Sequence, residues 1–124
     1  MTTEQKARIN RAVAESLGWT VEKMQLMWWI KDPCGHVVED IDFEEEITGS
    51  KAWPDYFTDE AASATLLEAM QEVYLVHSSK SNEWECAANV WPTSFNTKPN
   101  QFDPDRRTAI LMAYCAWKEI PYEL

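Results

Sequence analysis

Glycine and proline are scarce in this sequence: its 124 residues contain 3 Gly and 6 Pro. Long flexible linkers are therefore not expected. No stretch repeats along the chain, no apolar run approaches the length of a membrane-spanning helix, and the first residues lack the apolar region of a secretory signal. We expect a soluble, intracellular protein with one domain over residues 1–124, which is long enough to bury a hydrophobic core.

Cysteine is also sparse, and its pattern disfavours two kinds of site. Cys34, Cys86 and Cys115 are odd in number, far apart and without a Cys-x-x-Cys motif. This pattern is typical of buried thiols in a reducing cytosol and not of a disulfide framework. Cys34 and His36 lack the spacing of a common zinc site, and His77 supplies no second close pair. We therefore predict no metal site and no cofactor.

Basic residues are few, at 11 against 21 acidic ones, and the formal net charge is −10. Such a chain repels the phosphates of nucleic acids and anionic membrane surfaces, so neither is an expected direct partner. The charge suits a basic protein surface, including one that normally holds nucleic acid. Many soluble proteins are simply acidic, however, so charge alone does not define a function.

Apolar periodicity predicts a helix at the start of the chain. Ile9, Val13 and Leu17 fall four apart and share one row of a helix. Residues 2–5 have the spacing of a capping box, and Gly18 can take the left-handed conformation that ends a helix. Because the row is narrow, this helix needs a partner surface, and we expect a small sheet.

A hairpin is predicted after this helix. Apolar residues indicate a strand over 21–30, residues 32–35 are a strong Asp-Pro-Cys-Gly turn signal, and 36–38 can return as a second strand. Trp28 and Trp29 would point to opposite faces of the first strand, so both are buried only if the sheet is covered twice. Alternatively one of them, with Trp29 the candidate, is an aromatic platform for a partner or a base.

An acidic segment follows, with six carboxylates in eight residues: Glu39, Asp40, Asp42, Glu44, Glu45 and Glu46. Ile41, Phe43 and Ile47 interrupt them, so the segment is either an exposed strand edge or a loop held by its apolar residues. Its alternating acids are similar to a calcium-binding loop, but Glu45 stands where that loop needs glycine. These six carboxylates and Trp29 are the candidate partner-binding residues.

The second half of the chain predicts a further helix and hairpin. The helix begins at Asp59, capped by Thr58, and continues to Val73. Strands over 74–77 and 83–91 flank a polar turn and make the stronger of the two hairpins.

The last helix is predicted after a loop over 92–101. Asp103-Pro104-Asp105 is a helix start, and Pro121 follows its end. Its expected buried stripe consists of Ile110, Ala113, Tyr114 and Trp117. The order of elements predicts an α+β fold: a small, mainly antiparallel sheet of three to four strands, covered by three helices as a helix–sheet–helix sandwich.

Residues 9–20, Ile-Asn-Arg-Ala-Val-Ala-Glu-Ser-Leu-Gly-Trp-Thr, resemble the start of the phage ABA sandwich domain family, small proteins of phages and prophages. Three further stretches are similar to family segments in the same order: Trp28-Trp29 with the turn Pro33-Cys34-Gly35-His36, Pro54-Asp55-Tyr56 with the 62–73 helix, and the 84–91 strand with the helix that carries Arg106, Arg107 and Ala109. Residues 39–47 resemble an insertion, and Asp55 replaces the family's usual Asn. The resemblance implies a sandwich fold and a phage source, and no established activity.

Three functions fit these observations. The first is a protein-binding module in the host cytoplasm, which inhibits a host defence complex by presenting nucleic-acid-like charge. The second is a protein that sequesters a nucleotide signal, for which the available residues are Arg8, Arg11, Arg106, Arg107 and Trp91. The third is a virion or assembly component. A cysteine nucleophile would need an adjacent histidine and an orienting group, and no signature supports one, so no catalytic residue is predicted.

Overall fold

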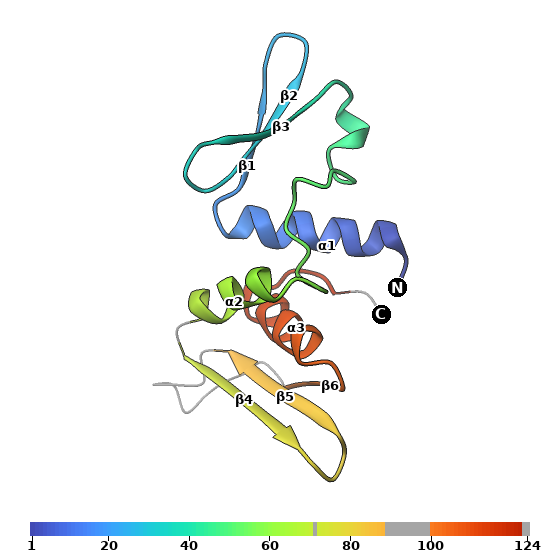
Figure 1. Ribbon diagram of the computed structural model, residues 1–124, viewed down its shortest axis with the longest axis vertical. Coiled ribbons are helices and arrows are strands. Elements are labelled where there is room, and N and C mark those ends of the chain that lie inside the picture. The colour runs from blue at the N-terminus through green and yellow to red at the C-terminus, as the bar shows by residue number, and fades with distance from the viewer. Residues whose placement is uncertain (71, 89–99, 123–124) are drawn as a thin grey trace. The chain divides into compact units, whose positions relative to one another are not determined.

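The computed structural model describes residues 1–70, 72–88 and 100–122 (Figure 1). The described residues form two compact units, Met1–Pro54 and Asp55–Tyr122. They contain three α-helices and two antiparallel three-stranded sheets, which confirms the predicted α+β class. The strands form two sheets, β1-β2-β3 in the first unit and β4-β5-β6 in the second, where the prediction had one sheet. The single domain over residues 1–124 stays a prediction.

Helix α1, Thr3–Ser16, begins with the predicted capping box. The Thr2 hydroxyl accepts a hydrogen bond from the Gln5 N–H at 3.1 Å, and the Gln5 side chain accepts one from the Thr2 N–H at 2.7 Å. Ile9 and Val13 of the predicted row are buried in α1, and Leu17, its third member, is half-buried at the residue after the helix. None of the helices in the described ranges is long and apolar enough to cross a bilayer.

Gly18 follows α1 with a φ of +105°, a conformation that side chains disfavour. A Cβ at this position would also lie 3.4 Å from the Cβ of Pro33. Gly18→Ala is therefore expected to lower the free energy of unfolding by about 1–2 kcal/mol, measured by chemical denaturation. Gly49→Ala is the control, because a Cβ there meets nothing within 4 Å. Equal losses in the two variants would contradict this explanation.

The first sheet is formed by β1 (Thr20–Lys23), β2 (Trp28–Lys31) and β3 (Val37–Ile41). The prediction of one strand over 21–30 was wrong. Residues 24–27 form a tight turn, in which the Met24 N–H donates to the Met27 carbonyl at 2.8 Å, and this turn separates β1 from β2. Strand β3 extends to Ile41, so the acidic segment begins within a strand.

The turn between β2 and β3 is the predicted one. Asp32 Oδ1 accepts hydrogen bonds from the N–H groups of Cys34 and His36, both at 2.9 Å. Gly35 has a φ of +89°, and its N–H donates to the Asp32 carbonyl. The bond from the His36 N–H is the main reason that the pKa of Asp32 lies below its ordinary value. One carboxylate therefore fixes this turn.

The segment after β3 completes the first unit. Ile47 and Trp53 are buried, and the Trp53 Nε1–H donates to the Ile47 carbonyl at 2.7 Å. The Trp53 ring lies 5.9 Å from the ring of Trp19 and 5.9 Å from the guanidinium of Arg11. Arg11 also donates to the Thr48 hydroxyl at 2.9 Å. These contacts attach residues 47–53 to α1.

In the second unit, α2 spans Glu60–Ala69 and α3 spans Arg106–Lys118. The cap of α2 is Asp59, whose carboxylate accepts from the Ala61 N–H at 2.9 Å, so the predicted cap at Thr58 was one residue early. The predicted end at Val73 was also wrong, because Val73 opens a strand.

The second sheet contains β4 (Val73–Ser78), β5 (Glu83–Ala88) and β6 (Gln101–Asp103), and α3 packs against β5, β6 and α2 (Figure 1). The β4–β5 hairpin confirms the stronger predicted hairpin. Gln101, expected in a loop, belongs to β6. Residues 89–91 of the predicted strand and 92–99 of the predicted loop lie outside the described residues.

The predicted stripe of α3 is confirmed at three of its positions. Ile110, Ala113 and Tyr114 are buried, and Trp117 is half-buried with its ring edge-on to Tyr114 at 5.8 Å. The helix ends at Glu119, which has a φ of 58°, shortly before Pro121. The core of this unit therefore lies under α3.

Candidate protein-binding surface

Trp28 and Trp29 lie on opposite faces of β2, and both are half-buried. Trp28 shares its face with Ile30, which is fully buried, and it lies opposite Ile41 of β3, which is also buried. Cross-strand partners share one face of a sheet, so Trp28 is on the core side of the first sheet.

Trp29 is on the polar face. It lies opposite Glu22 of β1 and Asp40 of β3, both of which are exposed. The Lys31 ammonium lies 5.6 Å from the Trp29 ring and forms an ion pair with Glu22. Trp29 therefore presents an aromatic surface beside charged groups, which suits a contact with a polar partner surface. Its assignment as a partner-binding residue stays a prediction.

The acidic segment is a strand edge in its first part and a short helix in its second, where the two expectations were a strand edge or a loop. Its first part lies in β3, and Glu44–Glu46 form a short 3-10 helix, η1, after that strand. Glu39 is half-buried and accepts a hydrogen bond from the Ser50 hydroxyl. The other five carboxylates are exposed: Asp40, Asp42, Glu44, Glu45 and Glu46. The segment thus displays most of its charge on the protein surface.

Two exposed apolar side chains lie at the same end of the sheet. Trp28 opposite Ile41 places the β1–β2 turn beside the end of β3, as Figure 1 shows. Leu26 in that turn is 89% exposed, and Phe43 before η1 is 59% exposed. Residues 24–27 line a shallow surface hollow of about 340 Å³. We call the surface formed by residues 24–27 and 40–46 the acidic end of the first sheet.

Sequence reasoning missed Leu26, because it assigned residues 21–30 to one continuous strand. Phe43 was noted only as an interruption of the acids, although an exposed aromatic side chain among charges is a frequent anchor at protein interfaces.

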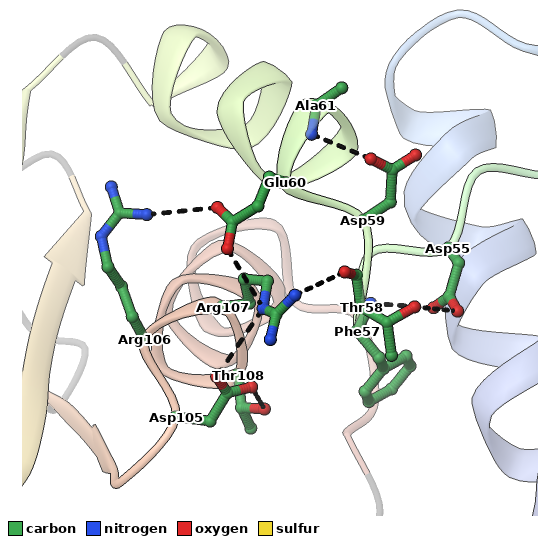
Figure 2. Close-up of polar contacts among 10 residues, drawn as sticks. All are labelled: Asp55, Phe57, Thr58, Asp59, Glu60, Ala61, Asp105, Arg106, Arg107 and Thr108. Atoms are coloured by element: carbon green, nitrogen blue, oxygen red, sulfur yellow. Dashed lines mark hydrogen bonds and ion pairs between the residues drawn. The ribbon is translucent and has the colours of Figure 1, made fainter.

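Arg106 and Arg107, two of the arginines proposed for a nucleotide pocket, contact protein groups. Figure 2 shows Glu60 between Arg106 and Arg107, with nitrogen–oxygen distances of 3.5 and 3.4 Å. Arg107 also donates to the Thr58 carbonyl at 2.5 Å and lies 3.7 Å from Asp105. These contacts join the N-terminal ends of α2 and α3.

The loop before α2 is organised by Asp55. Its carboxylate accepts from the Phe57 N–H at 3.0 Å and from the Thr58 hydroxyl at 2.6 Å (Figure 2).

Two further residues were proposed for the nucleotide pocket. Arg11 forms an ion pair with Glu15 at 3.1 Å in addition to its contact with Thr48, and Trp91 lies outside the described residues.

The cysteines show no activated nucleophile in the described ranges. Cys86 and Cys115 are fully buried, and burial raises the pKa of the Cys86 thiol to about 11 and that of Cys115 to about 12. The prediction of buried thiols was wrong for Cys34, which is exposed in the β2–β3 turn. The His77 ring lies 5.0 Å from the ring of Trp84. Within residues 1–70, 72–88 and 100–122, no three His, Cys, Asp or Glu residues are placed to hold a metal ion.

A comparison of this chain with protein families, characterised proteins and solved structures finds no match.

Proposed function

We propose that this protein is a protein-binding module and that the acidic end of its first sheet docks on a basic surface of a partner protein. The observation that carries the proposal is the placement of Leu26 and Phe43, both highly exposed, beside five exposed carboxylates. Protein interfaces combine apolar anchors with a polar rim, and this surface supplies both. The net charge of −10 would also steer encounter with a cationic partner.

The resemblance to the phage ABA sandwich family supports a narrower form of this proposal. The partner is then a host defence protein in the host cytoplasm, with a groove that normally holds nucleic acid. Carboxylates at the acidic end would take the positions of phosphates, and Trp29 would contact the rim of that groove. Double-stranded DNA and this protein should therefore compete for the same partner.

A charge-reversal variant tests the proposal. The variant Glu44→Lys, Glu45→Lys, Glu46→Lys changes three exposed side chains of η1. Proteins captured from a nuclease-treated bacterial lysate are quantified by mass spectrometry and eluted with rising salt or with double-stranded DNA. The specific partner should bind the variant at least about tenfold more weakly, with a flatter salt dependence.

Glu4→Lys, Glu68→Lys, Glu119→Lys is the matched control, because it makes the same change of net charge at three exposed positions outside η1. This control should retain the partner. Equal retention of the partner by both triple variants would overturn the proposal. If double-stranded DNA does not release the partner, the mimicry of nucleic acid is overturned.

A further inference from the structure

Strand β4 lies at one edge of the second sheet, whose strand order is β4-β5-β6. It pairs with β5 on one side, and within the described ranges no strand pairs with its other side. Alternate residues of an edge strand direct their N–H and C=O groups away from the sheet. Those groups can bond a further strand, which makes an open edge a template for association.

The other sheet edges carry features that prevent such association, and β4 carries none of them. Strand β1 contains Glu22 and Lys23, β3 contains Glu39 and Asp40, and β6 is only three residues long. Charges and short length are the usual protections of an edge strand. Strand β4 has six residues, Val-Tyr-Leu-Val-His-Ser, with neither a charged residue nor a proline.

We propose that β4 pairs with β4 of a second copy of this chain, antiparallel about a two-fold axis, so that two second sheets join into one of six strands. With the axis at Leu75, Tyr74 lies opposite Val76 of the second copy, and this pair occurs twice. Tyr74 is 44% exposed and Val76 is 43% exposed on the same face. An aromatic residue opposite a β-branched one is a favourable cross-strand pair. An axis at Val76 would instead place Tyr74 opposite Ser78.

The charges around β4 suit this register. Glu72 precedes the strand and Lys80 lies in the turn after it, and both are exposed. Extending the register places Glu72 opposite Ser78 of the second copy and diagonal to its Lys80, so each end of the interface brings opposite charges together. Two copies of a chain with a net charge of −10 repel elsewhere, and β4 lets them meet without opposed carboxylates.

The oligomeric state tests the proposal. Sedimentation equilibrium over a dilution series should show a mass that approaches twice 14.4 kDa at high concentration. Val76→Lys should raise the dimer dissociation constant at least about tenfold, because it removes both Tyr–Val pairs and adds like charges at the edge. Val37→Lys is the matched control, since Val37 is also 43% exposed but lies in β3, and it should leave the dimer intact. Circular dichroism of each variant checks that the fold is kept.

Cysteine cross-linking tests the register. In a Cys34→Ser background, Tyr74→Cys protein is mixed with Val76→Cys protein under mild oxidation. Opposed residues lie within disulfide range, so the mixture should cross-link faster than either variant alone. A monomer at every concentration, a dimer unaffected by Val76→Lys, or equal weakening by Val37→Lys would overturn the dimer. Cross-linking no faster in the mixture would overturn the register.

Discussion

The free energy of unfolding of the second unit is expected to fall steeply as the pH rises above 9. Cys86 and Cys115 have pKa values of about 11 and about 12 in the folded protein, against 9.0 when exposed. A raised pKa gives stability that is fully present below pH 9 and is lost as the pH rises toward the folded value, because the unfolded state then binds fewer protons. Each thiol contributes a slope that is half of about 1.4 kcal/mol per pH unit at pH 9 and approaches the full value near pH 10.

Urea denaturation between pH 8 and pH 10 measures this slope. Burial also raises the pKa of Tyr122, to about 12, but its ordinary value of 10.0 places its main effect above this window. The double variant Cys86→Ala, Cys115→Ala should be less stable at neutral pH and should lose most of the slope. The same slope in the double variant would show that the buried thiols are not its source.

Leu66→Ala is expected to destabilise the protein by about 2–5 kcal/mol, a large part of the stability of a small domain. Leu66 lies in α2 and is fully buried, so truncation leaves a cavity in addition to the lost apolar burial. Helix α2 has only ten residues and depends on packing for its stability. Chemical denaturation and the α-helical circular dichroism signal measure the effect.

Leu26→Ala is the matched control, since Leu26 is 89% exposed and its truncation removes little buried surface. It should change the free energy of unfolding by less than about 0.5 kcal/mol. Comparable losses in the two leucine variants would contradict the assignment of Leu66 to the core and of Leu26 to the surface.

The start of α1 was the most predictable helix end, because capping is local and Thr2 and Gln5 form the expected box. The other two starts were displaced: α2 is capped by Asp59, and α3 is capped by Asp105 because Asp103 belongs to β6. The turn at residues 24–27 was not predictable in this way. It contains neither glycine nor proline, and apolar residues at every second position continue through it. The pairing of Lys23 with Trp28 ends β1 there, and that pairing is not visible in local pattern.

The division into two sheets was missed for a related reason. Each hairpin follows from its own turn and alternation, but whether two hairpins share one sheet depends on non-local pairing. Only the acidic part of the candidate surface could be predicted from the sequence. Its carboxylates stand out in the composition, whereas the exposure of Leu26 follows from the turn that the sequence did not reveal.

The β2–β3 turn gives the molecule a chemical handle. Cys34 is exposed there, while Cys86 and Cys115 are fully buried, so a maleimide dye or a biotin reagent should modify the native protein at one position. Antiparallel pairing puts this turn and the acidic end at opposite ends of the same short strands. A protein immobilised through Cys34 would therefore hold Leu26, Phe43 and the η1 carboxylates toward the solution, in the orientation that a surface-based binding measurement requires.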